Sequence, residues 1–290
     1  MDLHGVGVAL VTPFDSQGEI DFSSLEKLIN HLINNKIDYL VPIGTTGESV
    51  TLSHEEKVEI FRFVAQIASD RIQLVAGIGG NNTRELLNSL KKFNLNKYSA
   101  ILSVSPYYNK PNQEGIFQHY KLFSESTPLP VILYNVPSRT GSSISVQTIL
   151  RLAKEKNIIG VKEASGNMDQ CMKLAAQKPK DFWLISGDDA LTLPLISVGF
   201  DGIISVVANI FPESFSKMTH AALTNDFVSA RKIHHSLLDF IDLLFADGSP
   251  SGVKTGLKAL GICDDYLRLP LAKVNADIAN SITEFVNSNK

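Results

Sequence analysis

The sequence has few cysteines and no excess of charge of either sign. Only Cys171 and Cys263 are present, far apart and without a CxxC spacing, which argues against a disulfide framework or a zinc ribbon and predicts two reduced core thiols. The 27 basic residues nearly balance the 30 acidic ones, and the net charge is −3. Because the basic residues are spread along the chain, no nucleic-acid partner is expected.

Targeting signals and metal-ligand clusters are also missing. The opening stretch MDLHGVGVALVTPF has no basic n-region, and its apolar run is too short to span a bilayer, so we expect a cytoplasmic protein that does not bind membranes. No HExxH motif occurs, and the adjacent His234 and His235 would lie on different faces of a helix. The glycine-rich GIGGNNT stretch lacks the residues of a P-loop and is read as a turn between a strand and a helix.

Short apolar runs alternate with amphipathic stretches throughout most of the 290 residues, of which 44% are hydrophobic. This alternation is typical of strand-helix units around a parallel sheet. Eight strands and seven intervening helices fit a closed (β/α)8 TIM barrel, with an open doubly wound sheet as the alternative. The predicted strands are 5–14, 39–44, 72–79, 98–106, 130–137, 158–165, 182–188 and 201–210, and the predicted helices are 22–35, 54–69, 83–94, 113–126, 145–156, 168–178 and 190–199.

Helical patterns alone follow the last strand, from about Phe211 onward. They predict helices over 227–246, 252–262 and 271–288. No low-complexity linker intervenes, so we expect a catalytic barrel over 1–224 and a C-terminal helical region over 225–290 that packs on it.

Lys162 is an unexpected residue within IIGVKEASG, which otherwise resembles a buried strand. Strict alternation places Ile158, Gly160 and Lys162 on one face and Glu163 on the other. A lysine at the carboxyl end of a barrel strand, shielded from water, has a lowered pKa and can form a Schiff base with a carbonyl compound. The alternative is an ion pair with a carboxylate such as Glu163.

Other strands end in residues that suit the same chemistry. Tyr134 ends the fifth strand, where a phenol near an imine can relay protons, and Arg139 follows in a proline-led turn, where a guanidinium suits a carboxylate. The alternatives are a core tyrosine for Tyr134 and, for the GTTGES stretch after the second strand, a plain turn. GTTGES after the second strand offers two hydroxyls and flexible glycines, and SPYYNKP after the fourth presents two tyrosines that also suit a subunit interface.

Taken together, GTTGE, SPYYNKP, YNVPSRTG, GVKEASG and SGDD, in this order, closely resemble the dihydrodipicolinate synthase family of pyruvate-dependent class I aldolases. The likeness covers nearly the whole chain. It implies that Lys162 forms the imine with pyruvate and that Tyr134, Thr45 and Tyr108 relay protons, with Tyr108 reaching into a neighbouring subunit. It further implies substrate binding by Thr46, Arg139, Gly187 and Ile204.

The resemblance implies condensation of pyruvate with L-aspartate 4-semialdehyde to 4-hydroxy-tetrahydrodipicolinate, in lysine and diaminopimelate biosynthesis, by a homotetramer. No metal or organic cofactor is needed, because the protonated imine is the electron sink. N-acetylneuraminate lyase and 2-keto-3-deoxy sugar-acid aldolases share the core chemistry and remain alternatives, although the Gly-Thr-Thr-Gly loop and Arg139 favour the synthase. A barrel that binds a 2-oxo acid without turnover is a third possibility.

The resemblance also implies an effector site for L-lysine at a dimer interface, but with one departure. Lys57 stands where lysine-sensitive relatives typically have histidine, and a second cation should repel the ammonium groups of the ligand. We therefore predict weak or absent feedback inhibition. A loop at 246–257 departs from the Asn-Pro-x-Pro-Val-Lys pattern of relatives, outside the catalytic set. The residues that match the effector site are Ser49, His54, Asn81, Glu85 and Tyr107.

Overall fold

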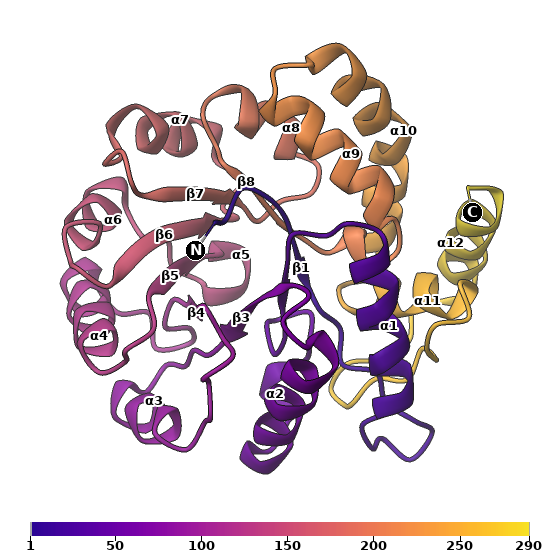
Figure 1. The fold of residues 1–290 in the computed structure, drawn as a ribbon, viewed down its shortest axis with the longest axis horizontal. Coiled ribbons are helices and arrows are strands. Elements are labelled where there is room, and N and C mark those ends of the chain that lie inside the picture. The colour runs from indigo at the N-terminus through magenta and orange to yellow at the C-terminus, as the bar shows by residue number, and fades with distance from the viewer. Residues whose placement is uncertain (1, 290) are drawn as a thin grey trace.

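Eight parallel strands form a closed barrel in the computed structural model, which describes residues 2–289 (Figure 1). Each strand pairs with its neighbours in sequence, and β1 pairs with β8, so the predicted TIM barrel is confirmed and the open sheet is wrong. All eight strands are shorter than predicted, because some of the apolar runs continue beyond the strand as buried loop, as at 10–13 after the first strand. The strands are β1 (Gly5–Ala9), β2 (Tyr39–Val41), β3 (Gln73–Gly77), β4 (Ala100–Val104), β5 (Val131–Asn135), β6 (Ile158–Glu163), β7 (Trp183–Ser186) and β8 (Gly202–Ser205).

Helices cover the outside of the barrel, as the alternating pattern predicts (Figure 1). A capping box begins α2 (His54–Ala68), since Ser53 and Glu56 hydrogen-bond reciprocally at its start. Two short helices follow the carboxyl ends of strands, namely η1 (Ser49–Thr51) and α5 (Pro137–Thr140). The others between strands are α1 (Phe22–Asn34), α2 (His54–Ala68), α3 (Thr83–Leu90), α4 (Gln113–Glu125), α6 (Val146–Leu152), α7 (Met168–Gln177) and α8 (Thr192–Ser197).

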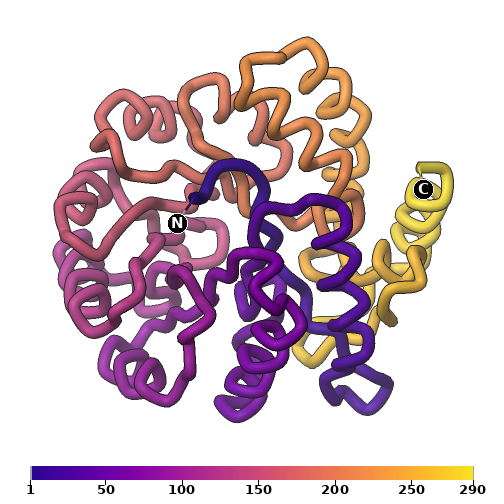
Figure 2. The backbone as a smooth tube through the Cα atoms, in the orientation of Figure 1, coloured from indigo at the N-terminus to yellow at the C-terminus, as the bar shows by residue number. Residues whose placement is uncertain are grey.

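The chain after β8 is helical, as predicted. A short η2 (Val207–Asn209) leads into α9 (Pro212–Leu223), which the sequence pattern did not single out and which packs against β1 and β8 as the eighth barrel helix. Three further helices follow, α10 (Phe227–Phe245), α11 (Ser251–Ala259) and α12 (Ala276–Ser288). The backbone trace shows α11 and α12 at the edge of the barrel, beyond α1 and α10 (Figure 2). The division of the chain into a barrel over 1–224 and a helical region over 225–290 stays a prediction.

The predicted alternation of faces along β6 is wrong at its first residue. Ile158 pairs with Val131, whereas Gly160 pairs with Ile132, so the register shifts by one residue between them. Ile158 consequently packs with Val161 in the layer between sheet and helices. The irregularity lies before Gly160, so the side chain of Lys162 still points into the barrel.

Both cysteines are free and buried, in agreement with the sequence prediction. Burial raises the pKa of each thiol to about 12, so neither is a reactive nucleophile near neutral pH. Within residues 2–289, no helix combines the length and apolar character needed to cross a bilayer.

Candidate active site

Lys162 lies near the carboxyl end of β6 with only 5% of its surface exposed. It pairs in register with Tyr134 on β5, and its Nζ lies 4.5 Å from the centroid of the Tyr134 ring. The electron-rich face of the phenol thus borders the amine. Among residues 2–289, no carboxylate forms an ion pair with Lys162.

The Glu163 carboxylate, the alternative partner for this lysine, is engaged on the opposite face of the strand. It accepts hydrogen bonds from Asn135 Nδ2 at 2.9 Å, from Gln170 Nε2 at 3.0 Å and from the Ser165 backbone N–H at 2.7 Å. Three neutral donors therefore satisfy this buried acid. The ion-pair interpretation of Lys162 with Glu163 is wrong, because successive side chains of a strand point to opposite faces.

Gly187, immediately after β7, leaves room for the lysine side chain. A Cβ built at this position would lie 2.9 Å from Lys162 Cε and 2.7 Å from Ala164 Cβ, which is closer than side chains approach. Any larger residue at 187 would therefore displace the amine. Gly187, which the resemblance assigns to substrate contact, shapes the wall beside the Lys162 side chain.

The loop after β2 carries Thr45 and Thr46 to the same mouth of the barrel. Its two ends are unusual, since Ile43 has φ of +59° and Glu48 has φ of +55°. Residues other than glycine rarely adopt this left-handed conformation, and a β-branched one is a clear outlier. Such backbone geometry persists only where surrounding contacts impose it, and it is concentrated at functional sites.

A cavity of about 490 Å³ opens at the carboxyl ends of the strands, and we call it the barrel-mouth cavity. Five of the predicted site residues line it together: Lys162, Tyr134, Thr45, Thr46 and Arg139. The fold thus brings residues from four segments to one place. An amine in this setting, shielded from bulk water and next to a phenol, is arranged to attack a carbonyl group. Gly187 also lines the cavity, with Ala164 and Asp188.

Arg139, on α5, is held at the mouth of this cavity by a hydrogen bond from its Nη2 to the Ser249 carbonyl oxygen at 3.2 Å. Ile204 is placed differently from the other predicted residues. It is 1% exposed in the barrel interior, packed in the same cluster as Tyr134, and is not among the residues that line the cavity.

A second cavity, of about 550 Å³, adjoins the first at Thr45, Tyr134 and Arg139, and we call it the loop cavity. Lys57 lies in its wall and is half-buried, and this burial lowers the pKa of its ammonium group. His54 stacks near Phe93 with its Nε2 buried and unpaired within the described chain. All five predicted effector residues line this cavity: Ser49, His54, Asn81, Glu85 and Tyr107.

Tyr108 is the predicted catalytic residue that does not line the barrel-mouth cavity of its own chain. It is 89% exposed, has φ of +71° and lines neither cavity. Its neighbour Tyr107 is held in place, because the Asn81 side chain donates to the Tyr107 carbonyl oxygen at 3.1 Å. The Tyr108 side chain thus projects away from the chain that carries it.

Several residues that line the barrel-mouth cavity were not predicted from the sequence. Asp189, the last residue of the SGDD motif, lines the barrel-mouth cavity, although the motif predicts no role for it. Burial raises the pKa of its carboxyl to about 6, although hydrogen bonds from the Ser205 hydroxyl and the Val206 backbone favour the charged form. Ile241 and Phe245 of α10 form another part of the wall, and nothing in a helix pattern signals that contact.

This chain is similar to known proteins along nearly its whole length. A profile of the Dihydrodipicolinate synthetase family matches residues 2–289. A 4-hydroxy-tetrahydrodipicolinate synthase of Flavobacterium psychrophilum is 49% identical over 282 residues, covering 97% of this chain and 96% of the relative. The synthase structure of Methylacidiphilum fumariolicum has a TM-score of 0.95 at 42% identity, covering 99% of this chain and 97% of that one. The Acinetobacter baumannii dihydrodipicolinate synthase, complexed with pyruvate, has a TM-score of 0.95 at 38% identity and 98% coverage of both chains. This chain belongs to the Dihydrodipicolinate synthetase family.

Proposed function

We propose that this chain condenses pyruvate with L-aspartate 4-semialdehyde to give 4-hydroxy-tetrahydrodipicolinate, a step of lysine and diaminopimelate biosynthesis, and that it works in the cytoplasm. The observation that carries the proposal is the environment of Lys162. Its amine is nearly buried, has no carboxylate partner among residues 2–289 and borders the Tyr134 ring in a cavity that Thr45 and Thr46 also line. The pyruvate complex of the Acinetobacter relative supports the choice of first substrate.

The chemistry follows from a free amine facing a 2-oxo acid. Lys162 Nζ attacks C2 of pyruvate, water leaves, and the protonated imine draws electrons from C3, which loses a proton to give an enamine. The enamine carbon attacks the aldehyde carbon of the second substrate. The amino group of that substrate then attacks the imine carbon, closes the ring and displaces Lys162, which restores the enzyme.

Each of these steps moves a proton, and the residues around the amine are suited to that task. The Tyr134 hydroxyl and the Thr45 hydroxyl share the cavity with Lys162 and form the start of the relay. Thr46 holds the pyruvate carboxylate with Thr45, and Arg139 orients the carboxylate of the aldehyde substrate. Gly187 and Ile204 stay proposed contacts for bound intermediates, Ile204 from beneath the cavity.

We infer that Tyr108 completes the relay of a neighbouring subunit, in a homotetramer built as a dimer of dimers. Its exposure and its position outside both cavities of its own chain support this role. Mixing Lys162→Ala subunits with Tyr108→Phe subunits should restore turnover above the sum of the two variants, because one mixed site combines an intact amine with an intact tyrosine. Activity that equals the sum, in oligomers shown to have exchanged subunits, would place Tyr108 outside the neighbour's site.

The synthase is favoured over N-acetylneuraminate lyase or a 2-keto-3-deoxy sugar-acid aldolase, because three relatives that are 48–49% identical over 93–97% of this chain are named as synthases. A pyruvate-consumption assay with each candidate aldehyde tests this directly. We expect turnover with L-aspartate 4-semialdehyde at least about 100-fold faster than with N-acetylmannosamine or glyceraldehyde, since a site built for a charged substrate rejects one lacking those groups. Faster turnover with a sugar aldehyde would reverse the assignment.

Weak inhibition by L-lysine is expected from the loop cavity. Lys57 occupies its wall together with the five residues of the effector pattern, so its ammonium lies where a second cation would have to bind. Steady-state rates should therefore change little with millimolar L-lysine. Lys57→His removes most of the repulsion near neutral pH and should increase inhibition about tenfold or more. Full inhibition of the unaltered enzyme by sub-millimolar L-lysine would contradict this prediction.

A further inference from the structure

Glu48 and Lys254 form a buried ion pair between positions 206 residues apart in the sequence. Both side chains are 0% exposed. Lys254, on α11, donates from Nζ to Glu48 Oε1 and to the Tyr266 carbonyl oxygen at 2.8 Å, and its Nζ lies 4.2 Å from the centroid of the Phe14 ring. Because both charges are out of contact with water, each depends on the other for its compensation.

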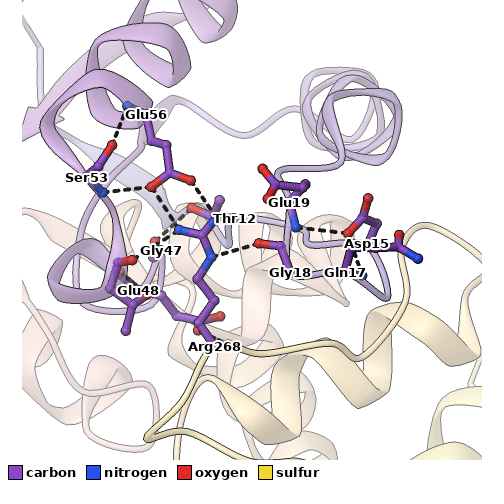
Figure 3. Close-up of polar contacts among 11 residues, drawn as sticks. Thr12, Asp15, Gln17, Gly18, Glu19, Gly47, Glu48, Ser53, Glu56 and Arg268 are labelled. Carbon is purple, nitrogen blue, oxygen red and sulfur yellow. Dashed lines mark hydrogen bonds and ion pairs between the residues drawn. The ribbon is translucent and has the colours of Figure 1, made fainter.

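Arg268 adds a second connection from the C-terminal segment to the same region (Figure 3). Its backbone N–H donates to Glu48 Oε2 at 3.2 Å, so both oxygens of that carboxylate are occupied. Its guanidinium extends to the Glu56 carboxylate, with Nη1 at 2.8 Å from Oε2, and also donates to the carbonyl oxygens of Gly18 and Thr51. The fork geometry of arginine makes this a rigid attachment.

These contacts converge on the loop that carries the two threonines of the barrel-mouth cavity. The Glu48 backbone N–H donates to the Thr45 carbonyl oxygen at 3.0 Å, and Thr46 lies between them in the sequence. Glu48 is itself in the left-handed conformation, which the loop does not adopt without an external restraint. The neighbouring carbonyl oxygen of Gly47 is held by the Thr12 hydroxyl at 2.7 Å. The loop is therefore held both by the segment after β1, through Thr12, and by α11, through Lys254.

We propose that Lys254, through its ion pair with Glu48, is a positioning residue for the reaction. It holds Thr45 and Thr46 where they receive the pyruvate carboxylate, although it touches neither substrate. The inference rests on the proposed function, which gives those threonines their role. The positioning role would explain why this ion pair is buried. Stability alone does not explain it, since a buried ion pair rarely stabilises a fold more than apolar residues of the same size.

The test compares Lys254→Met with an unrelated core variant. Methionine keeps the apolar length of the side chain and removes the charge, so Glu48 loses its ion pair and keeps only the hydrogen bond from the Arg268 backbone N–H. We expect kcat/KM for pyruvate to fall about 10- to 100-fold, mostly through KM, because small displacements of a binding group have effects of this size. Ile149→Ala, a fully buried residue of α6 remote from the loop, lowers stability without changing the KM for pyruvate. Rates are measured where circular dichroism shows each variant to be folded.

A double variant keeps the test decisive if Lys254→Met does not fold. Glu48→Gln combined with Lys254→Met leaves no uncompensated charge, so stability should recover while the KM for pyruvate stays raised. A double variant that recovers stability and pyruvate KM together would overturn the proposal and leave a purely structural role. Borohydride trapping of pyruvate on the unaltered enzyme distinguishes failure of the proposed function from failure of the positioning role. If pyruvate is not trapped, the proposed function is wrong. If pyruvate is trapped and the folded variants have a normal KM for pyruvate, only the positioning role is wrong.

Discussion

Replacing Lys162 with alanine is expected to lower turnover by at least about 10⁴-fold, because it removes the nucleophile on which every later step depends. The fold should be retained, since the side chain ends in the barrel-mouth cavity and neutralises no carboxylate among residues 2–289. Borohydride added with pyruvate should attach a stable mass to the peptide that contains Lys162 in the unaltered enzyme. The variant should show no such adduct.

Lys173→Ala is the matched control, because this lysine lies on α7, directly after the same strand, and is exposed in an ion pair with Asp169. It should retain full turnover and full labelling. An adduct on any lysine other than Lys162, or substantial turnover by Lys162→Ala, would remove the basis of the mechanism.

The barrel and the lysine inside it can both be predicted from the sequence, for a common reason. Buried parallel strands are continuous apolar runs, so eight of them can be counted, and an ionisable residue within one is conspicuous. Lys162 stands out on this ground alone, without any resemblance to a known family. The face assignment of Ile158 failed, because the register shift before Gly160 depends on pairing with β5 and leaves no signal in β6 itself.

Contacts between segments that are distant in the sequence could not be predicted either. Glu48 and Lys254 each look like ordinary surface charges in their own segments, and only the folded barrel brings them together. The same holds for Asp189, whose burial depends on the chain after β8, and for the cavity wall formed by Ile241. Tyr108 differs from these cases, since its proposed role requires another subunit.

Tyr134→Phe is expected to lower kcat about 10²- to 10³-fold, the usual effect of removing a group that transfers protons. The phenylalanine ring keeps the contact with the amine, because the aromatic face that borders Lys162 Nζ at 4.5 Å is unchanged. The KM for pyruvate should therefore change little. Pyruvate should still be trapped on Lys162 by borohydride, but imine formation, followed in single-turnover experiments, should be slower.

Tyr98→Phe deletes the same atom at a remote position and separates this effect from a general loss of packing. The Tyr98 hydroxyl is buried and donates to the Phe61 carbonyl oxygen at 2.9 Å, so its removal should lower the free energy of unfolding by about 1 kcal/mol and leave kcat unchanged. If Tyr134→Phe behaves like Tyr98→Phe, with lower stability and normal turnover, the Tyr134 hydroxyl carries no proton in the rate-limiting step. A slow kcat with normal pyruvate affinity instead assigns the hydroxyl to proton transfer, since the ring alone accounts for the binding geometry.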